Sequence, residues 1–334
     1  LCRAFDGDHK AAVGALNKAA EQESDFEAAV ELETIAQLLE LTDGADRIAL
    51  KERIYAPANV AKLLSDLDDH DRFHRLPEHK EEAVRPDAVY ELLDRPMPAD
   101  DAGLTADTVP NVVAELSIFN ESDPDRGDGG PRAVLSSFEG DEWDAAATLI
   151  EQIDLPEAAE TEQPAGSEAD GLPRELWNLR WRWAFPDDVP LRRRRELEGE
   201  EWTRRIHDVW PQTPLAALSG KTPAEAADDE SAARPLAAAL YVLDAVCDRG
   251  RYELNLNGLR SRFGLPAIEP QPAPENAQLN AYSILHLQRT DLSRLDDRQL
   301  ITVLNRVLLV HPSRFLRATL TEALGRESLA DQFD

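Results

Sequence analysis

The sequence predicts an all-α fold, with helices packed in three successive parts of the chain. Apolar residues recur three and four positions apart over long stretches in which Ala, Leu and Glu dominate. Proline and glycine gather between these stretches, where they end helices. With 334 residues the chain exceeds the usual size of one hydrophobic core, so we expect more than one domain.

The first part, residues 1–155, is predicted to be an acidic helical region. Residues 9–72 show the helical period, as in FEAAVELETIAQLLEL, and Pro57 stands where a helix would begin. Residues 86–153 are expected to add short helices, of which TVPNVVAELSIF is the most apolar.

Two segments poor in large apolar side chains separate the predicted parts. Residues 156–171 contain the acidic run PEAAETEQPAGSEAD, whose composition predicts a disordered linker. Residues 266–277 are rich in proline, which favours an extended connector. These segments delimit a Trp-rich central domain at 172–265 and a C-terminal helical segment at 278–334. Within the latter, Asp296 is predicted to cap a helix.

Negative charge is concentrated in the first half of the chain. The formal net charge is −29; residues 1–170 carry 41 acidic and 14 basic side chains, and residues 171–334 carry 24 and 22. An acidic surface repels phosphate backbones and anionic lipids. No apolar run approaches the roughly 18 residues of a membrane span. We therefore expect neither a nucleic-acid nor a membrane partner and a cytoplasmic location, and we leave open that the chain, which begins with Leu1, is a fragment.

The two cysteines, Cys2 and Cys247, are too few for a disulfide framework or a four-thiolate zinc site. Both are expected to be reduced, and the apolar context LYVLDAVC predicts that Cys247 is buried.

Tryptophan clusters near the centre of the chain. Five of the six tryptophans are Trp177, Trp181, Trp183, Trp202 and Trp210. Arginines between them, including a run at 192–195, would suit single-stranded nucleic acid if the rings served as stacking platforms. We favour core packing, because Trp177 and Trp181 would share one face of a helix and glutamates after Arg195 offset the arginines.

A helix start follows Trp210 in WPQTPLAALSGKTPAEA. Thr222 is placed as the N-cap, Pro223 as the first helical residue and Glu225 as the third residue after the cap. Together they predict a capping box.

This segment resembles the toxin-binding C-terminal domain of Xre/MbcA/ParS-type antitoxins. The residues that match the family's motif are, in order, Trp210, Pro214, Leu218, Gly220, Thr222 and Pro223. The resemblance implies a helical domain that binds a partner toxin and often dimerises, preceded by a DNA-binding helix-turn-helix. Here the preceding chain is acidic and lacks a basic recognition helix, so operator binding is not expected.

Downstream, the stretch YELNLNGLRSRFGLP is compatible with two secondary structures. It could be the second helix of a helix-turn-helix with Arg260 and Arg262 exposed, or a short strand followed by a helix.

The histidine-rich stretch DLDDHDRFHRLPEH is the strongest candidate for chemistry. His70 and His74 are four residues apart with Asp66 one turn earlier, so on one helix face they could bind a transition metal. Glu78 and His79 follow. The alternative is a set of surface histidines. Elsewhere the sequence has no HExxH pattern, P-loop, GxGxxG or nucleophile motif.

These observations lead to one hypothesis and two alternatives. The leading hypothesis is a noncatalytic protein-interaction protein without a cofactor. Its predicted contact residues are Trp210, Pro214, Leu218, Gly220, Thr222, Pro223 and Glu225. The alternatives are an antitoxin-like regulator that binds a toxin, and a metal-dependent enzyme that uses His70 and His74.

Overall fold

The chain folds into two compact units. The computed structural model describes residues 6–43, 46–77, 86–101, 103–120, 130–153, 155–164, 171–273, 278–310 and 312–332. Unit 1 is discontinuous in sequence and comprises Leu1–Gly44 and Pro211–Asp334, whereas unit 2 is Ala45–Trp210. These boundaries differ from those of the predicted parts, because composition marks loops but does not show which helices pack together. Cys2, Glu78 and His79 lie outside the described residues.

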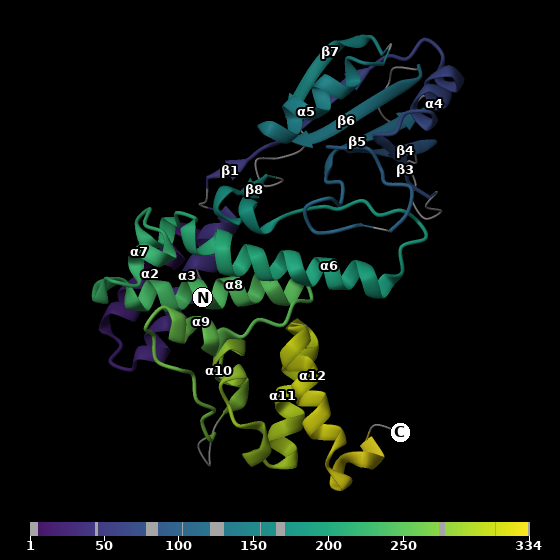
Figure 1. The fold of residues 1–334 in the computed structure, drawn as a ribbon. Coiled ribbons are helices and arrows are strands. Elements are labelled where there is room, and N and C mark those ends of the chain that lie inside the picture. The colour runs from purple at the N-terminus through teal and green to yellow at the C-terminus, as the bar shows by residue number, and fades with distance from the viewer. Residues whose placement is uncertain are drawn as a thin grey trace. The chain divides into compact units, whose positions relative to one another are not determined.

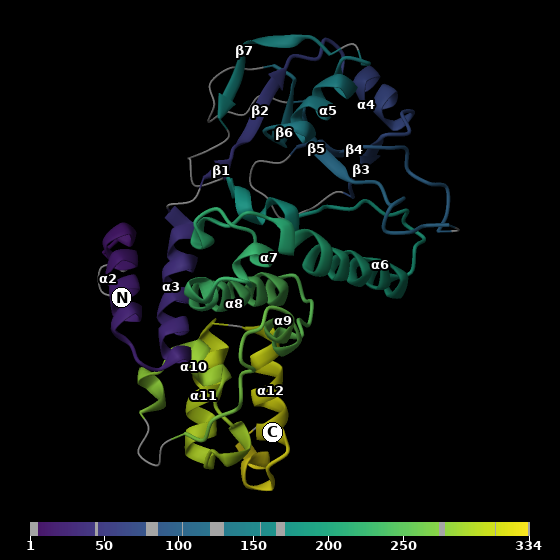
Figure 2. The same ribbon diagram turned by 60° about the vertical axis from the view of Figure 1, so that its left-hand side comes forward.

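Unit 2 is built on an antiparallel sheet (Figure 1). In the described part of the chain the strand order is β3-β4-β5-β6-β2-β7. The strands are β2 (Leu50–Tyr55), β3 (Phe73–Arg75), β4 (Ala88–Leu93), β5 (Val112–Phe119), β6 (Arg132–Phe138) and β7 (Glu157–Pro164). A second, two-stranded ladder pairs β1 (Arg47–Ile48) with β8 (Leu172–Pro173). Helices α4 (Val60–Asp68) and α5 (Asp141–Ile150) lie on one face of the larger sheet (Figures 1 and 2).

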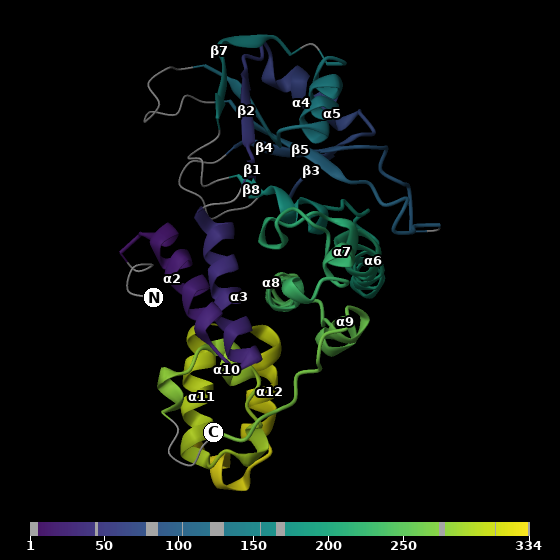
Figure 3. The same ribbon diagram turned by 90° about the vertical axis from the view of Figure 1, so that its left-hand side faces the viewer.

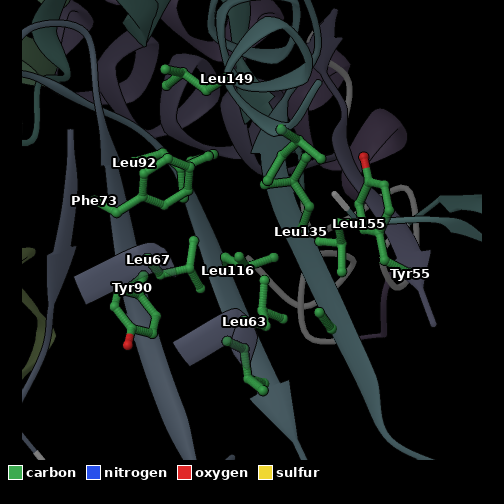
Figure 4. Close-up of a cluster of buried hydrophobic side chains, with 14 of the residues drawn as sticks. Tyr55, Leu63, Leu67, Phe73, Tyr90, Leu92, Leu116, Leu135, Leu149 and Leu155 are labelled. Carbon is green, nitrogen blue, oxygen red and sulfur yellow. The ribbon is translucent and has the colours of Figure 1, made fainter. Parts of the chain in front are cut away.

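The core of unit 2 fills the space between this face and the two helices (Figure 4). Side chains alternate along β5, so that Leu116 and Ile118 are buried in this core. Leu135 of β6 stands opposite Leu116 in the ladder and is also fully buried. Leu67 of α4 and Leu149 of α5 close the cluster from the helical side. The alternation of side chains along the strands therefore determines which face of the sheet is buried.

The all-α prediction is wrong, because this sheet forms the core of unit 2. The predicted helix TVPNVVAELSIF contains β5, and LKERIY, which lies within the predicted helical stretch 9–72, is β2. The apolar residues of β5 alternate with polar ones and include the β-branched Val112, Val113 and Ile118, which favour a strand. A short apolar run fits both the helical period of about 3.6 residues and the strand period of two, and the helical interpretation was incorrect.

The predicted disordered linker at 156–171 also contains a strand. Residues Glu157–Pro164 form β7, which pairs antiparallel with β2 across a register shift between Arg53 and Tyr55. A strand added at a sheet edge is held by main-chain hydrogen bonds, so it needs few apolar side chains. Composition alone therefore did not indicate it. Residues 165–170 lie outside the described residues.

After the sheet, unit 2 continues through short helical elements. They are the 3-10 helix η2 (Arg174–Leu179), the helix α6 (Leu191–Arg204) and the π-helical turn η3 (Arg205–Val209).

Unit 1 is mainly helical in the residues that the structure describes (Figure 3). Its α-helices are α2 (His9–Gln22), α3 (Phe26–Asp43), α7 (Pro223–Ala226), α8 (Ala233–Arg249), α9 (Leu256–Arg262), α10 (Ile284–Gln288), α11 (Asp297–Val310) and α12 (Ser313–Leu324). Helices α2 and α3 form a hairpin, and α3 also packs on α8. The predicted cap of α11 is confirmed, because the Asp296 carboxylate accepts the N–H of Gln299 at 2.8 Å.

Three carboxylates of α3 form ion pairs with arginines that lie about 200 or more residues later in the sequence. The pairs are Glu27 with Arg260, Glu31 with Arg289 and Glu33 with Arg234. The Arg260 side chain is 0% exposed, so its guanidinium depends on Glu27 for charge compensation. These pairs connect the two sequence segments of unit 1.

Within the described residues, no helix combines the length and the apolar character that a bilayer crossing requires.

Candidate functional site

The predicted contact residues divide between buried and exposed positions. The buried ones are Trp210 at 3% exposure, Leu218 and Pro223. Thr222 is half-buried, whereas Pro214, Gly220 and Glu225 are exposed. The boundary between the units falls directly after Trp210, so Trp210 belongs to unit 2 and the other predicted contact residues belong to unit 1.

The turn before α7 is well defined. Ser219 and Gly220 have φ angles of 58° and 81°, and the N–H of Gly220 donates to the carbonyl of Leu215. The predicted capping box is confirmed: the N–H of Glu225 donates to the Thr222 hydroxyl, and the Glu225 carboxylate accepts the N–H of Thr222 at 2.8 Å. The motif thus begins a helix, and its exposed residues form a small turn surface.

The histidine pair is not assembled as predicted. Helix α4 ends at Asp68, so His70 lies in the following turn and His74 lies on β3. The ring of His70 accepts the N–H of Arg72 at 3.2 Å and stacks edge-on with Phe73. The helix therefore does not extend far enough to bring His70, His74 and Asp66 onto one face. Among the residues that the structure describes, no group of three or more His, Cys, Asp or Glu side chains could hold a metal ion.

Several tryptophan rings of unit 2 pack against other aromatic rings and against arginine. Trp181 does not share a helix with Trp177, because η2 ends at Leu179. The Trp181 ring makes an edge-to-face contact with Trp202, at 4.7 Å between centroids. The Arg205 guanidinium lies 4.9 Å from the Trp181 ring centroid.

The carboxylate of Glu201 organises the arginines beside this cluster. It is buried and accepts hydrogen bonds from Arg204 and Arg205. Burial acts to raise the pKa of Glu201, and the hydrogen bonds from the two guanidinium groups more than offset it, so the pKa is lowered. The cationic groups are thus engaged within the unit.

The basic residues of the possible recognition helix are also engaged. They lie on α9, where Arg260 is buried against Glu27, so it cannot contact DNA in this fold. Arg262 is exposed, as predicted.

A pocket of about 260 Å³ opens beside α8 in unit 1. We call it the α8 pocket. Its apolar lining comes from Leu38, Ala245, Ile284, Leu285, Val310 and Phe315. Segments far apart in sequence, α3, α8, α10 and the α11–α12 corner, therefore meet at this site.

Two aspartates one turn apart on α8 line the pocket. The carboxylate of Asp248 caps α12, since it accepts the N–H of Ser313 at 2.7 Å and the N–H of Arg314 at 2.9 Å. The other aspartate, Asp244, pairs through Oδ2 with the Arg314 guanidinium, which also donates to the carbonyl of Leu254 at 3.0 Å. The pocket wall is thus held by a carboxylate–arginine network.

Asp244 is a buried polar group of the pocket that is not fully satisfied. Its side chain is 8% exposed, and Oδ1 has no hydrogen-bond partner among the described residues. Burial raises the pKa of this carboxyl, and the nearby Arg314 offsets only part of the effect. A buried charged acceptor without a donor is unfavourable, so Oδ1 of Asp244 lacks a hydrogen bond that would stabilise it.

Cys247 lies on the same helix and is fully buried, as predicted. Burial, reinforced by the charge of Asp244, raises the pKa of its thiol to about 12. A thiol with this pKa is a poor nucleophile at neutral pH.

Exposed apolar side chains adjoin the pocket at the end of α11. Leu308, Leu309 and Val310 are 42%, 83% and 59% exposed, and Val310 also lines the α8 pocket. We call these three residues the α11 ridge. Three consecutive large apolar residues facing solvent are unusual on a helix end and typical of a contact surface.

Sequence reasoning missed both features. The available signals were the run VLLV that ends α11 and the two aspartates in the apolar helix YVLDAVCDRG. Neither signal shows that α3 and α10 complete the pocket, because that follows from long-range packing.

Comparisons with models of known protein families, with curated proteins and with solved structures found no match for this chain.

Proposed function

We propose that this chain is a noncatalytic protein-interaction protein and that unit 1 carries its contact surface, formed by the α11 ridge and the adjoining α8 pocket. The observation that carries the proposal is the exposure of Leu308, Leu309 and Val310 beside a pocket with an apolar lining. Burial of such side chains against a partner is favourable by about 25 cal/mol per Å² of apolar surface.

Charge supports a polypeptide partner. Unit 1 has 26 acidic and 16 basic residues, a balance of −10, and unit 2 has 39 and 20, a balance of −19. Both units therefore repel polyanions, whereas basic or neutral protein surfaces can approach.

The antitoxin-like alternative has a narrower basis. The turn before α7 exposes Pro214 and Gly220, and α7 itself exposes Glu225; these residues would form the contact with a small toxin. This turn is a second surface of unit 1 and can be tested separately from the α11 ridge.

The test uses the full chain as bait in cells of its source. A doubly substituted chain, Leu309→Asp with Val310→Asp, places charge on the ridge without disturbing a buried residue. Leu191→Asp is the matched control, because Leu191 is 62% exposed on α6 of unit 2. We expect a stoichiometric protein partner with the wild type and the control and its loss with the doubly substituted chain.

Two outcomes would contradict the proposal. Recovery of no stoichiometric partner would contradict an interaction function. A partner that survives the ridge substitutions but is lost with Pro214→Glu would transfer the contact to the turn and favour the antitoxin-like alternative.

A further inference from the structure

The carboxylate of Asp244 is a buried acceptor that the fold leaves incomplete. Oδ2 accepts from Arg314, whereas Oδ1 has no partner among the described residues. Leaving a buried charged group short of a hydrogen bond costs stability, so such a group persists where something else supplies the donor.

Two polar groups next to Asp244, Asp248 and Arg314, are already engaged in hydrogen bonds. Both carboxylate oxygens of Asp248 accept N–H groups at the start of α12. The Arg314 guanidinium donates to Asp244 and to the carbonyl of Leu254. Arg249 and Gln288 also line the α8 pocket, but no donor among the described residues bonds to Oδ1 of Asp244. A cationic donor makes the stronger bond to a carboxylate.

The size of the pocket limits the occupant. About 260 Å³ is far more than the roughly 30 Å³ share of one water, yet it lies below the range of roughly 300–1,000 Å³ that is usual for drug-sized ligands. It suits a group about as large as one long side chain. Leu38, Ala245 and Leu285 offer apolar contacts for an alkyl stem.

We propose that the α8 pocket binds an alkylammonium or alkylguanidinium group, with the alkyl stem on the apolar lining and the cation donating to Asp244. This is the chemistry of a Lys or Arg side chain presented by the protein partner, and in that form the inference rests on the proposed function. A free alkylamine is the other source of the same chemistry. The net charge of −10 on unit 1 concentrates cations of either kind near the pocket.

The experiment titrates the full chain with n-butylammonium and n-propylguanidinium, and with 1-pentanol as the uncharged counterpart. Methyl NMR signals of Leu38, Ile284 and Leu285 report occupancy. We expect saturable shifts with the two cations and at least about tenfold weaker binding of 1-pentanol, because a hydrogen bond to a charged group accounts for that much affinity.

Three variants locate the cation contact. Asp244→Asn should weaken n-butylammonium binding by about tenfold or more. Ala245→Leu, which fills the pocket without changing Asp244, should abolish the shifts. Asp228→Asn removes the same charge at an exposed position of unit 1 and should leave binding unchanged. Circular dichroism confirms that each variant is folded.

The inference is overturned if neither cation gives saturable shifts, if 1-pentanol binds as tightly as the cations, or if either folded Asp244→Asn or folded Ala245→Leu binds like the wild type. These titrations need no partner, so they fail independently of the proposed function. If the cations bind but the bait recovers no partner, a free amine is the ligand. If a partner is recovered, replacing its Lys and Arg residues at the contact identifies the side chain.

Discussion

The two units of this chain are specified by different kinds of information. Unit 2 is continuous in sequence, and its core follows from a local rule, since alternation along β5 and β6 decides which side chains meet α4 and α5. Unit 1 is discontinuous, and its two segments are joined by carboxylates of α3 that pair with Arg234, Arg260 and Arg289. A hydrophobic pattern can determine how neighbouring segments pack, whereas segments far apart in sequence need specific pairs of residues to join them.

The most severe test of this contrast removes the buried cation of unit 1. In Arg260→Met, Glu27 loses its compensating charge, and we expect a loss of about 3–5 kcal/mol in the free energy of unfolding of unit 1. Denaturant unfolding with probes in each unit measures it.

Arg262→Met is the control for this change, because Arg262 is exposed on the same helix. Combining Arg260→Met with Glu27→Leu should recover much of the stability, since an apolar pair can replace a buried ion pair. Equal stability of the wild type and Arg260→Met would refute the view that this pair specifies unit 1.

For unit 2 the corresponding change is Leu116→Ala, which leaves a cavity at the centre of the sheet. We expect a loss of about 2–5 kcal/mol, confined to the unfolding transition of unit 2. Ser117→Ala, at the neighbouring half-buried position, should have a much smaller effect. If both substitutions were equally mild, the alternation in β5 would not be what determines the core.

A smaller effect is expected at the start of α7. Thr222→Ala removes the hydroxyl that accepts the N–H of Glu225, and helix caps of this kind contribute about 0.5–2 kcal/mol. Thermal unfolding of unit 1 should move down by a few degrees. Thr222→Ser keeps the cap and should restore the midpoint; an unchanged midpoint in Thr222→Ala would show that the capping box contributes nothing.

The smallest expected effects are pH-dependent and opposite in the two units. Because the folded pKa of Glu201 is lowered, its stabilisation is present above the ordinary value of 4.5 and is lost as the pH falls through the folded pKa. Because the folded pKa of Asp244 is raised, its ionised form opposes folding above that pKa, and acidification towards 3.8 relieves the opposition.

Acid titration of the two unfolding transitions measures these contributions. Glu201→Gln should reduce the acid sensitivity of unit 2, and Asp244→Asn should remove the opposite trend from unit 1. Glu200→Gln, at an exposed position, is the control. Identical pH profiles for Glu201→Gln and the wild type would exclude the network around Glu201 as a source of stability.

The sequence allowed some features to be predicted and concealed others for physical reasons. Capping signals were reliable, since Asp296 caps α11 and Thr222 and Glu225 form the capping box, and the apolar context of Cys247 indicated its burial. Helical spacing was not: Trp177 and Trp181 do not share a helix, and His70 and His74 lie outside α4. The sheet was missed because short apolar runs such as β5 fit both periods.

The candidate site could not be predicted from local pattern. Asp244 was one acidic residue among many in the sequence, and only packing of α3, α10 and α12 on α8 gives it a buried oxygen and an apolar pocket. The contact residues proposed from the motif included Trp210, whose burial at 3% exposure places it in the interior.

The divided sequence of unit 1 also determines the order in which the protein can mature during synthesis. Domains generally fold as units while the chain emerges, so unit 2 has all of its residues before unit 1 does. The α2–α3 hairpin leaves the ribosome before unit 2, at a time when Arg260 and Arg289, the partners of Glu27 and Glu31, have not been synthesised. We expect this hairpin to complete its packing only after translation has passed Arg289.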